Sequence, residues 1–330
     1  MTNIELKQKW SGLSENPITS GFRSLRISAD CICELYLGVS SEGKRCLILA
    51  LPENKRLDFK GVQKENLSIE YFGEKNLIVL QLTDIDFSDL FDDLVLSLYH
   101  GIKNISLVDE YSNHFIQAFY RWSDFFEDKK SDLLSEDTIK GIMGELLVLK
   151  LLIISPDRPE INFLLKAWTG LYDKGNDFEL ELKNIEVKTK SSSGIDVKIS
   201  SEFQLEVSPG KGLELYVVSL QSDFTVGIHI RDLILEIKKM VQEFSGDNTI
   251  LWKALSQKNI TAKNLNQYDR YRFQPINWIS YNCADENFPK LSRSNIPEEI
   301  SALKYILRTN LLTSFIIGQS NFLHENSGIS

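Results

Sequence analysis

The sequence has few of the residues that hold metals through sulfur or nitrogen. Its 330 residues include only four cysteines and four histidines. The cysteines, which are Cys31, Cys33, Cys46 and Cys283, form no CxxC pair, and no histidine lies at a ligand spacing from them. The histidines form no HxH or HExxH motif. We therefore expect neither a structural zinc site nor a disulfide framework, and the unpaired cysteines favour a reducing compartment.

The sequence also lacks the short motifs that bind nucleotides or activate a serine nucleophile. It has no Walker A motif, no GxGxxG fingerprint and no GxSxG elbow, which argues against ATPase, dinucleotide-binding and serine-hydrolase functions. No stretch reaches the ~18 apolar residues of a membrane span. The first residues contain no basic segment followed by an apolar run, so no signal peptide is predicted. We expect a cytoplasmic protein with no membrane partner.

Basic residues are fewer than acidic ones. There are 37 lysines and arginines against 46 aspartates and glutamates, which gives a formal net charge of −9. This balance excludes a uniformly basic surface for nucleic acid. It leaves room for a local basic cleft, because nearby groups set the field in a cleft. The hydrophobic fraction of 42% and the charged fraction of 25% are typical of a soluble globular protein.

What the sequence does contain is a β-rich first part. Short runs of β-branched and aromatic residues alternate with turn residues. They predict an antiparallel meander with strands over 21–27, 31–39, 44–51, 67–72 and 76–82. Helices are predicted over 83–102, with Ser88 as N-cap, and over 109–128. An acidic cluster lies at the start of the first helix, and we interpret it as capping and solvated residues, not a calcium loop: Asp84, Asp86, Asp89, Asp92 and Asp93.

A further helix, predicted over 135–153, carries one acid beside its apolar stripe. Ser135 is expected to cap it. The stripe recurs at steps of four, three and four residues: Ile142, Leu146, Leu149 and Ile153. Glu145 lies next to this stripe, and Gly144 removes a side chain where another backbone can approach. The alternative for Glu145 is a glutamate whose stem packs while its carboxylate stays in solvent.

The run "NIEVKTK", residues 184–190, predicts a strand with one polar face. Side chains alternate along a strand, so Glu186, Lys188 and Lys190 share a face. Asp177 follows the turn-like Gly175–Asn176 and starts a neighbouring strand. A hairpin through 183–184 would bring Asp177 and Glu186 together on one face.

Two carboxylates at close range raise each other's pKa and are stable as anions only around a cation. Mg²⁺ prefers oxygen ligands, uses one or two carboxylates and completes its shell with water and substrate phosphate. The predicted ligands are Asp177, Glu186, the carbonyl of Val187 and Glu145, with Lys188 positioning the attacking water. The alternative is a surface ion pair of Glu186 with Lys188, with Asp177 closing a turn.

These residues resemble the motif of the PD-(D/E)XK nuclease superfamily. Asp177, the run Glu186-Val187-Lys188 and the earlier Glu145 carry the resemblance. The stretches "GIMGELLVLKLL", "AWTG" and "IEVKTKSSSG" also look like a bacterial family of PD-(D/E)XK proteins from restriction or phage-defence loci. The resemblance is most specific from about 135 to 220. Asn176 stands where the motif has proline, at a position that varies across the superfamily and does not touch the metal.

The resemblance implies an α+β fold with a restriction-endonuclease-like α/β/α core and a mixed central sheet, preceded by a β-rich region. It also implies a helix near 201–207, from which Gln204 would face the site, and a strand over 213–220. We divide the chain into a β-rich accessory or recognition region, 1–128, a nuclease core, 129–245, and a C-terminal α/β extension, 246–330.

The predicted function is a Mg²⁺-dependent DNA endonuclease, with Mn²⁺ as a substitute, in a bacterial restriction or phage-defence system. DNA, a second copy in a homodimer, and ATPase or methyltransferase subunits are the expected partners. One alternative is a non-catalytic PD-(D/E)XK-like subunit for DNA binding or assembly. Another is a nuclease acting on RNA or branched DNA.

A few other residues have two interpretations. Trp168 is interpreted as scaffold, with base stacking as the alternative. Lys190 and the serines at 191–193 suit either phosphate contacts or a solvated loop. The "DRYRF" run, residues 269–273, interleaves arginines with aromatics as nucleic-acid surfaces do, and an ordinary exposed strand is the simpler interpretation.

Overall fold

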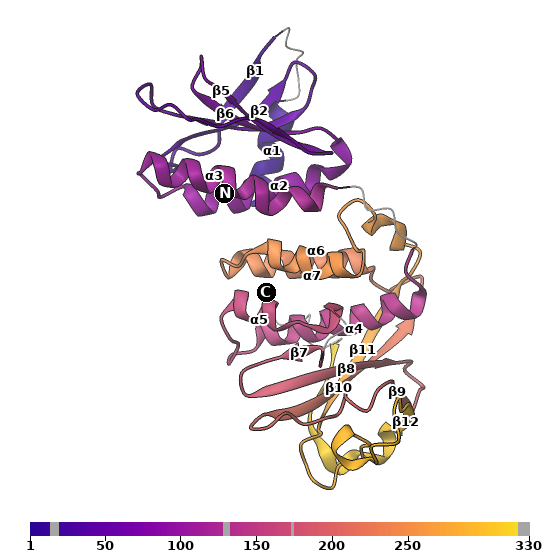
Figure 1. The fold of residues 1–330 in the computed structure, drawn as a ribbon. Helices are drawn as coiled ribbons and strands as arrows, with labels where there is room; N and C mark the ends of the chain where they lie inside the picture. The colour runs from indigo at the N-terminus through magenta and orange to yellow at the C-terminus, as the bar shows by residue number, and fades with distance from the viewer. Residues whose placement is uncertain (14–19, 128–132, 173–174, 323–330) are drawn as a thin grey trace. The chain divides into compact units, whose positions relative to one another are not determined.

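A computed structural model describes residues 1–13, 20–127, 133–172 and 175–322 (Figure 1). The chain forms two compact units. The N-terminal unit consists of residues 1–130 and 261–263, and the C-terminal unit of 131–260 and 264–330. The boundaries drawn from the sequence follow residues 128 and 245. In the structure, residues 264–330 belong to the same compact unit as 131–260.

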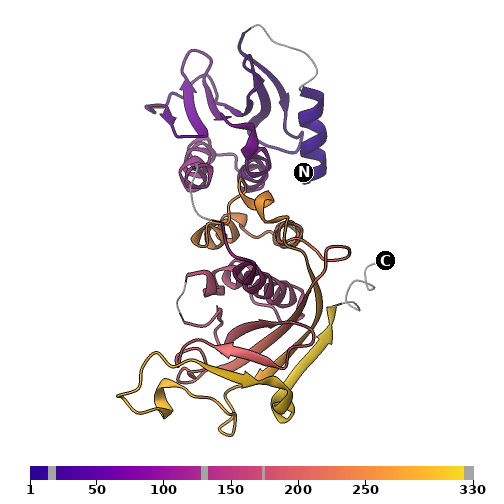
Figure 2. The ribbon, with the colours of Figure 1, turned by 90° about the vertical axis from the view of Figure 1, so that its right-hand side faces the viewer.

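The N-terminal unit is a six-stranded antiparallel sheet with helices against it (Figure 2). The strand order is β1-β2-β3-β6-β5-β4, so a single meander is not formed, because β3 pairs with β6. These two strands have the longest buried runs and take the centre of the sheet. The elements are α1 (Asn3–Leu13), β1 (Phe22–Arg26), β2 (Glu34–Ser40), β3 (Arg45–Ala50), β4 (Val62–Gln63), β5 (Leu67–Phe72), β6 (Leu77–Leu82), α2 (Ser88–Ile102) and α3 (Val108–Ser123).

Helix α1 was not predicted from the sequence, although its apolar residues have helical spacing. Leu6, Trp10 and Leu13 are buried, and they recur at steps of four and three. The start of α2 also differs from the prediction. Ser88 is the first helical residue, and Asp84 caps the preceding 3₁₀ turn by accepting from the N–H of Asp86.

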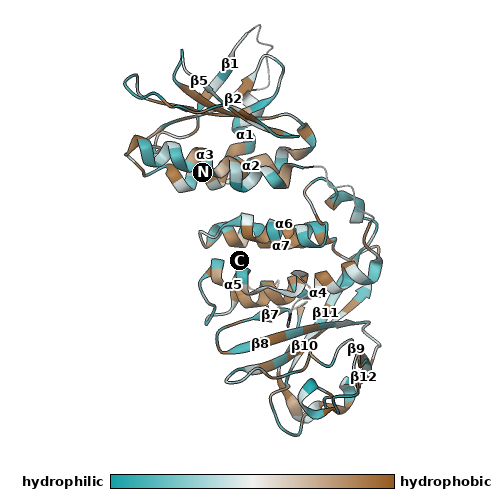
Figure 3. Cartoon of the chain, viewed as in Figure 1, coloured by the Kyte–Doolittle hydropathy of each residue, from teal (hydrophilic) through white to brown (hydrophobic). Residues whose placement is uncertain are grey.

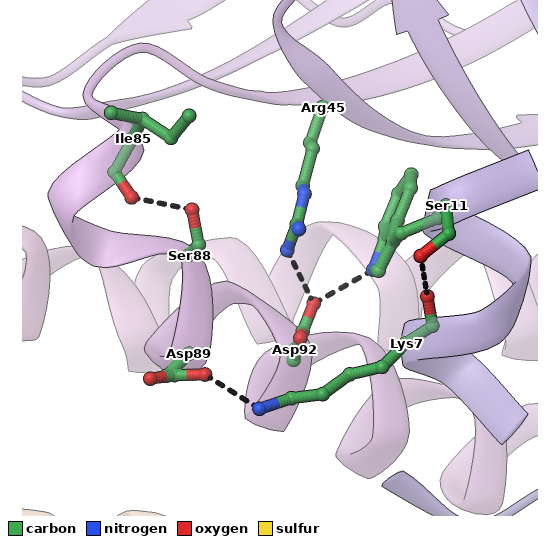
Figure 4. Close-up of polar contacts among 8 residues, drawn as sticks. Lys7, Ser11, Arg45, Ile85, Ser88, Asp89 and Asp92 are labelled. Carbon is green, nitrogen blue, oxygen red and sulfur yellow. Dashed lines mark hydrogen bonds and ion pairs between the residues drawn. The ribbon is translucent and has the colours of Figure 1, made fainter. Parts of the chain in front are cut away.

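The interpretation of the acidic cluster as solvated is wrong for Asp92 and Asp93, which are both buried. Asp92 Oδ1 accepts a hydrogen bond from Trp10 Nε1 at 2.7 Å and from the Arg45 guanidinium at 3.0 Å (Figure 4). This carboxylate therefore joins α1, β3 and α2. Sequence spacing does not reveal it, because the two partners are remote in the chain.

Asp92 predicts a pH-dependent stability. Burial raises its pKa to about 6, although Arg45 and Trp10 act in the opposite direction. The folded state therefore holds the proton more tightly than the unfolded state, so the associated stability is present below about pH 4 and lost as pH rises through about 6. This effect changes the free energy of unfolding by at most roughly 3 kcal/mol between about pH 4 and pH 7. We expect Asp92→Asn to remove this dependence of the unfolding free energy on pH. Urea unfolding at a series of pH values measures it.

The control is Asp86→Asn, at an exposed position on the same segment, which is expected to keep the wild-type slope. A wild-type slope in Asp92→Asn would contradict the assignment to this carboxyl group.

The C-terminal unit contains a five-stranded mixed sheet, as the sequence predicts. The strand order is β13-β11-β10-β8-β7, in which β8 and β10 are parallel and the other pairs antiparallel. The extension predicted at 246–330 supplies β11 and β13 to this sheet. The elements are α4 (Glu136–Ile154), α5 (Ile161–Ala167), β7 (Phe178–Glu179), β8 (Lys183–Lys190), β9 (Asp196–Ile199), β10 (Gly212–Ser222), α6 (Ile230–Glu243), α7 (Asn248–Gln257), β11 (Phe273–Asn282), β12 (Tyr305–Arg308) and β13 (Ile316–Asn321).

Helix α4 packs on β8 and β10, and α6 packs on α4 (Figure 1). Ser135 caps α4 by accepting from the N–H of Thr138, and the predicted stripe is buried. Figure 3 shows α4 as mostly hydrophobic, which is typical of a helix between other layers. A Cβ at Gly144 would clash with Thr189 Cγ2 and contact Val187 Cγ1. Helix and strand therefore approach closely at this glycine, with Val187 and Thr189 facing the helix.

The opposite face of this sheet is covered mainly by strands and loops. β9 and β12 form a two-stranded sheet. Apolar side chains of β9, β10, β11 and β12, with Leu205 from the turn after β9, form one core: Val197, Ile199, Leu205, Leu213, Leu215, Val217, Tyr281 and Leu307. The helix predicted near 201–207 is wrong, because the chain makes a turn there. The layer expected to be helical on this face is thus built from β9, β12 and their connections.

Between β10 and α6, Ile228 makes an isolated bridge with Phe273. Within the described ranges, no helix has the length and apolar character needed to span a membrane.

Candidate active site

The candidate site forms where β7 and β8 separate. β7 contains only two residues and pairs with β8 through Phe178 opposite Ile185. The turn that joins them lies at 180–182, not at the predicted 183–184, because Lys183 and Asn184 already belong to β8. On the other side of β7, Trp168 makes a bridge to Phe178. Asp177 therefore lies just beyond the last strand pair, at the edge of the sheet.

Asp177 occupies the place where the strand ladder would otherwise continue. Its Oδ2 accepts a hydrogen bond from the backbone N–H of Val187 at 2.7 Å. Its carbonyl accepts from the N–H groups of Thr169 and Gly170, at 2.8 and 3.0 Å. A strand residue directs its N–H and C=O to the same neighbour, so the Val187 carbonyl also faces the Asp177 side. This carbonyl is the predicted main-chain ligand.

Glu145 reaches the same place from α4. Its Oε2 accepts a hydrogen bond from Trp168 Nε1 at 2.7 Å. Trp168 itself is fully buried and stacks on Phe178, which agrees with its interpretation as scaffold. Glu145 Oε2 and Asp177 Oδ1 both lie within 2.7 Å of the point where a Cβ would stand on Gly170. The two carboxylates thus approach each other over a residue that has no side chain.

Glu186 approaches from the other side of the sheet. Val187 and Thr189 face α4, so alternation places Glu186 and Lys188 on the opposite face. Lys188 Nζ lies 2.6 Å from Glu186 Oε1, and Asn176 Nδ2 donates to Glu186 Oε2 at 3.3 Å. Glu186 and Lys188 thus share a face, as the alternation along the strand predicts. Glu145 and Glu186 come from opposite faces, and Asp177 lies at the edge between them.

These carboxylates line one cleft of about 630 Å³. Val187 and Lys188 stand behind this lining, hydrogen-bonded to Asp177 and Glu186. Gln204 lines the cleft as predicted, but from a turn. Its Oε1 accepts from the N–H of Ser200 at 2.7 Å. The lining residues are Thr138, Gly141, Ile142, Glu145, Gly170, Gly175, Asp177, Glu186, Ser201, Phe203, Gln204 and Lys258.

The surroundings of the cleft disfavour the ionised forms of its three carboxyl groups, those of Glu145, Asp177 and Glu186. Burial raises the pKa of Glu145 well above its ordinary value, and Asp177 raises it further. Burial also raises the pKa of Asp177, against the effects of Lys188, the Val187 N–H and Lys258. Burial and then Asp177 raise the pKa of Glu186 to about 7. A bound cation would relieve this repulsion.

The residues present fit a hard divalent cation at the edge of the sheet. Glu145 and Asp177 supply two carboxylates across the space above Gly170, and Mg²⁺ needs only one or two besides water and phosphate. In the described part of the chain, no group of three or more His, Cys, Asp and Glu side chains could hold a metal. Glu186 is paired with Lys188 and Asn176. The predicted set Asp177, Glu186, Val187 and Glu145 stays a prediction.

Three residues of the site were missed by the sequence reasoning. Asn176 was expected to matter little, yet its side chain also donates to the carbonyl of Gln204 and accepts from Asn184. It thereby holds Glu186 in place. Gly170, in the "AWTG" stretch, makes room for the two carboxylates. Lys258 follows α7 and brings positive charge to the cleft. The position of Asn176 directly before the acid, and of Gly170 in the "AWTG" stretch, could have signalled a role, whereas nothing in the local sequence marks Lys258.

Other residues singled out from the sequence lie outside the cleft lining. Lys190 Nζ donates to the carbonyl of Gly194 at 2.7 Å. Arg272 donates to His229 Nε2 and to the carbonyl of Phe224. Arg270 lies over the ring of Tyr271. In the structure, Lys190, Arg270 and Arg272 make these contacts outside the lining of the cleft that holds the carboxylates.

Comparisons with known proteins identify a family for this chain. No curated protein and no solved structure matches the chain. One family model does, over residues 6–310, and its description is "Putative PD-(D/E)XK family member, (DUF4420)". The match spans both compact units and includes every residue of the cleft lining. The chain belongs to this PD-(D/E)XK family.

Proposed function

We propose that this protein is a divalent-cation-dependent nuclease that hydrolyses phosphodiester bonds in DNA. The observation that carries the proposal is the meeting of Glu145 and Asp177 over Gly170, at a sheet edge that also carries the Glu186–Lys188 pair. Family membership supports it, since PD-(D/E)XK proteins are generally nucleases. Mg²⁺ is the proposed cation, with Mn²⁺ as a substitute.

Each residue has a role that follows from its contacts. Glu145 and Asp177 offer hard oxygen ligands, and Trp168 and Val187 fix their orientation through hydrogen bonds. Glu186 lines the cleft and holds the Lys188 ammonium directly behind it, at 2.6 Å. From there Lys188 would orient a water and stabilise charge that develops on the phosphate. When bound, the cation would supply Lewis-acid polarisation of the phosphoryl oxygens.

The first test is cleavage of supercoiled plasmid with and without a divalent cation. We expect nicking with Mg²⁺ or Mn²⁺ and none in excess EDTA. Lys188→Ala is expected to lower the rate by roughly 10²-fold, the loss typical for removing one charge-stabilising donor. The measurement is the initial rate of conversion to the nicked form.

Lys190→Ala, two residues further along β8, is the matched control, because Lys190 bonds to a neighbouring carbonyl outside the cleft lining. It is expected to cleave at the wild-type rate. Equal activity of wild type and Lys188→Ala would point to a contaminating nuclease. Inactivity of folded wild type with every cation would favour the alternative of a non-catalytic PD-(D/E)XK-like subunit.

The cellular setting of the proposed nuclease is supported by the resemblance alone. We propose a bacterial restriction or phage-defence system, with an ATPase or a methyltransferase as partner. The net charge of −9 argues for weak non-specific binding of DNA, so a partner or a second copy would aid targeting. A homodimer would contain two candidate active sites, one for each strand of a DNA duplex.

A further inference from the structure

One residue of the cleft lining is a phenylalanine with most of its surface exposed. Phe203 keeps 59% of its accessible surface and lines the cleft together with Glu145, Asp177 and Glu186. Single exposed apolar side chains are common on protein surfaces. Phe203 differs from these in its location, because it stands among the polar groups of the candidate active site.

The turn that carries Phe203 is fixed on both sides. The neighbouring Glu202 is buried, and its side chain accepts from the N–H of Leu303 at 3.0 Å. Leu205 is fully buried in the core beneath the sheet. The N–H of Phe203 donates to Ser201 Oγ at 3.1 Å. Glu202 and Leu205 therefore point inward and hold the turn, while Phe203 projects outward.

The same turn is tied directly to the catalytic side of the cleft. Asn176 Nδ2 donates to the carbonyl of Gln204 at 2.8 Å and also to Glu186 Oε2. Gln204 Oε1 accepts from the N–H of Ser200. The position of Phe203 is thus coupled, through one asparagine, to the position of the Glu186 carboxylate. Because these contacts hold the turn, its backbone loses little further entropy when a ligand binds.

We propose that Phe203 is a stacking platform for an unpaired nucleobase next to the phosphodiester held at the carboxylates. The proposal rests on the proposed nuclease function and specifies its substrate class. Inside a continuous duplex both faces of each base are covered by neighbouring pairs. Only a single-stranded, flipped or branch-point nucleotide offers a free face to an aromatic side chain. The favoured substrate is therefore DNA with an unpaired nucleotide at the cleavage position.

The test measures binding separately from cleavage. All variants are made in the full-length Asp177→Asn protein, and fluorescence anisotropy follows binding to a labelled single-stranded oligonucleotide and to a blunt duplex. Phe203→Ala is expected to weaken single-strand binding by roughly 5- to 100-fold, the range for loss of one base–aromatic stack. Phe203→Trp is expected to restore it, and Phe203→Leu is not, because leucine is apolar but cannot stack.

Phe224→Ala is the matched control, since Phe224 is also exposed, at 73%, but lies outside the cleft lining. It is expected to bind as the parent does. Unchanged single-strand binding in Phe203→Ala would overturn the proposal, and so would restoration by leucine or an equal loss on the blunt duplex. Plasmid cleavage by wild type tests the nuclease function independently, so failure of one proposal is distinguishable from failure of the other.

Discussion

Asp177→Asn is expected to abolish cleavage and at the same time to stabilise the protein. Asp177 is one of the two carboxylates that meet over Gly170, and an amide oxygen is a much weaker ligand for a hard cation. Loss of several kcal/mol of charge stabilisation in the transition state corresponds to a fall in rate of about 10³- to 10⁴-fold. Initial rates of plasmid nicking at saturating Mg²⁺ measure this fall.

The gain in stability has a separate cause. Burial raises the pKa of Asp177, so keeping this carboxylate ionised lowers the free energy of unfolding. Its presence also raises the pKa of Glu145 and of Glu186. Asparagine removes the charge and still offers an oxygen to the N–H of Val187. We expect the free energy of unfolding to rise by roughly 1 kcal/mol in metal-free buffer, as in other trade-offs between activity and stability.

Asp223→Asn is the control with the opposite expectation. The Asp223 carboxylate accepts hydrogen bonds from Thr225 and Val226, which lower its pKa. Its replacement is therefore expected to destabilise the protein slightly and to leave cleavage unchanged. If Asp177→Asn lost stability like Asp223→Asn, the repulsion inferred for the cleft would be absent.

Gly170→Ala is expected to suppress the proposed cleavage activity through one added methyl group. A Cβ at this position would stand within 2.7 Å of both Glu145 Oε2 and Asp177 Oδ1, which is closer than van der Waals contact. The carboxylates would have to move apart, and a displacement of about 1 Å at a reacting centre costs on the order of 10²-fold in rate. We expect a loss of at least this size, with a matching rise in the Mg²⁺ concentration needed for half-maximal activity.

Gly141→Ala is the matched control for this substitution. Gly141 also lines the cleft, but nothing lies within 4 Å of a Cβ added there. It lies inside α4, where alanine is favoured over glycine by about 1 kcal/mol. We expect wild-type cleavage and a higher melting temperature. Full activity in folded Gly170→Ala would show that the two carboxylates do not act together on a cation.

The local pattern of the sequence was enough to predict most helices and strands of the C-terminal unit. The strand over 184–190 and the helix over 135–153 have strong periodicity, and both are present in the structure. The short "DFEL" and "NIEVKTK" runs form β7 and β8, with Asp177 directly before the first of these strands and Glu186 in the second. Predictions were weaker where a segment is short or its environment mixed. The turn at 201–205 and helix α1 are examples, because their burial depends on partners elsewhere in the chain.

The sequence by itself determined the residue types of the site, the helix and strands that carry them, and the α+β class, because these depend on spacing along a few residues. Only the tertiary structure decided that Trp168 holds Glu145, that Asn176 holds Glu186, and that Lys258 enters the cleft. It also decided that β11 and β13 complete the sheet and that Asp92 is buried. Such contacts join residues remote in the chain, and their formation depends on how whole elements pack.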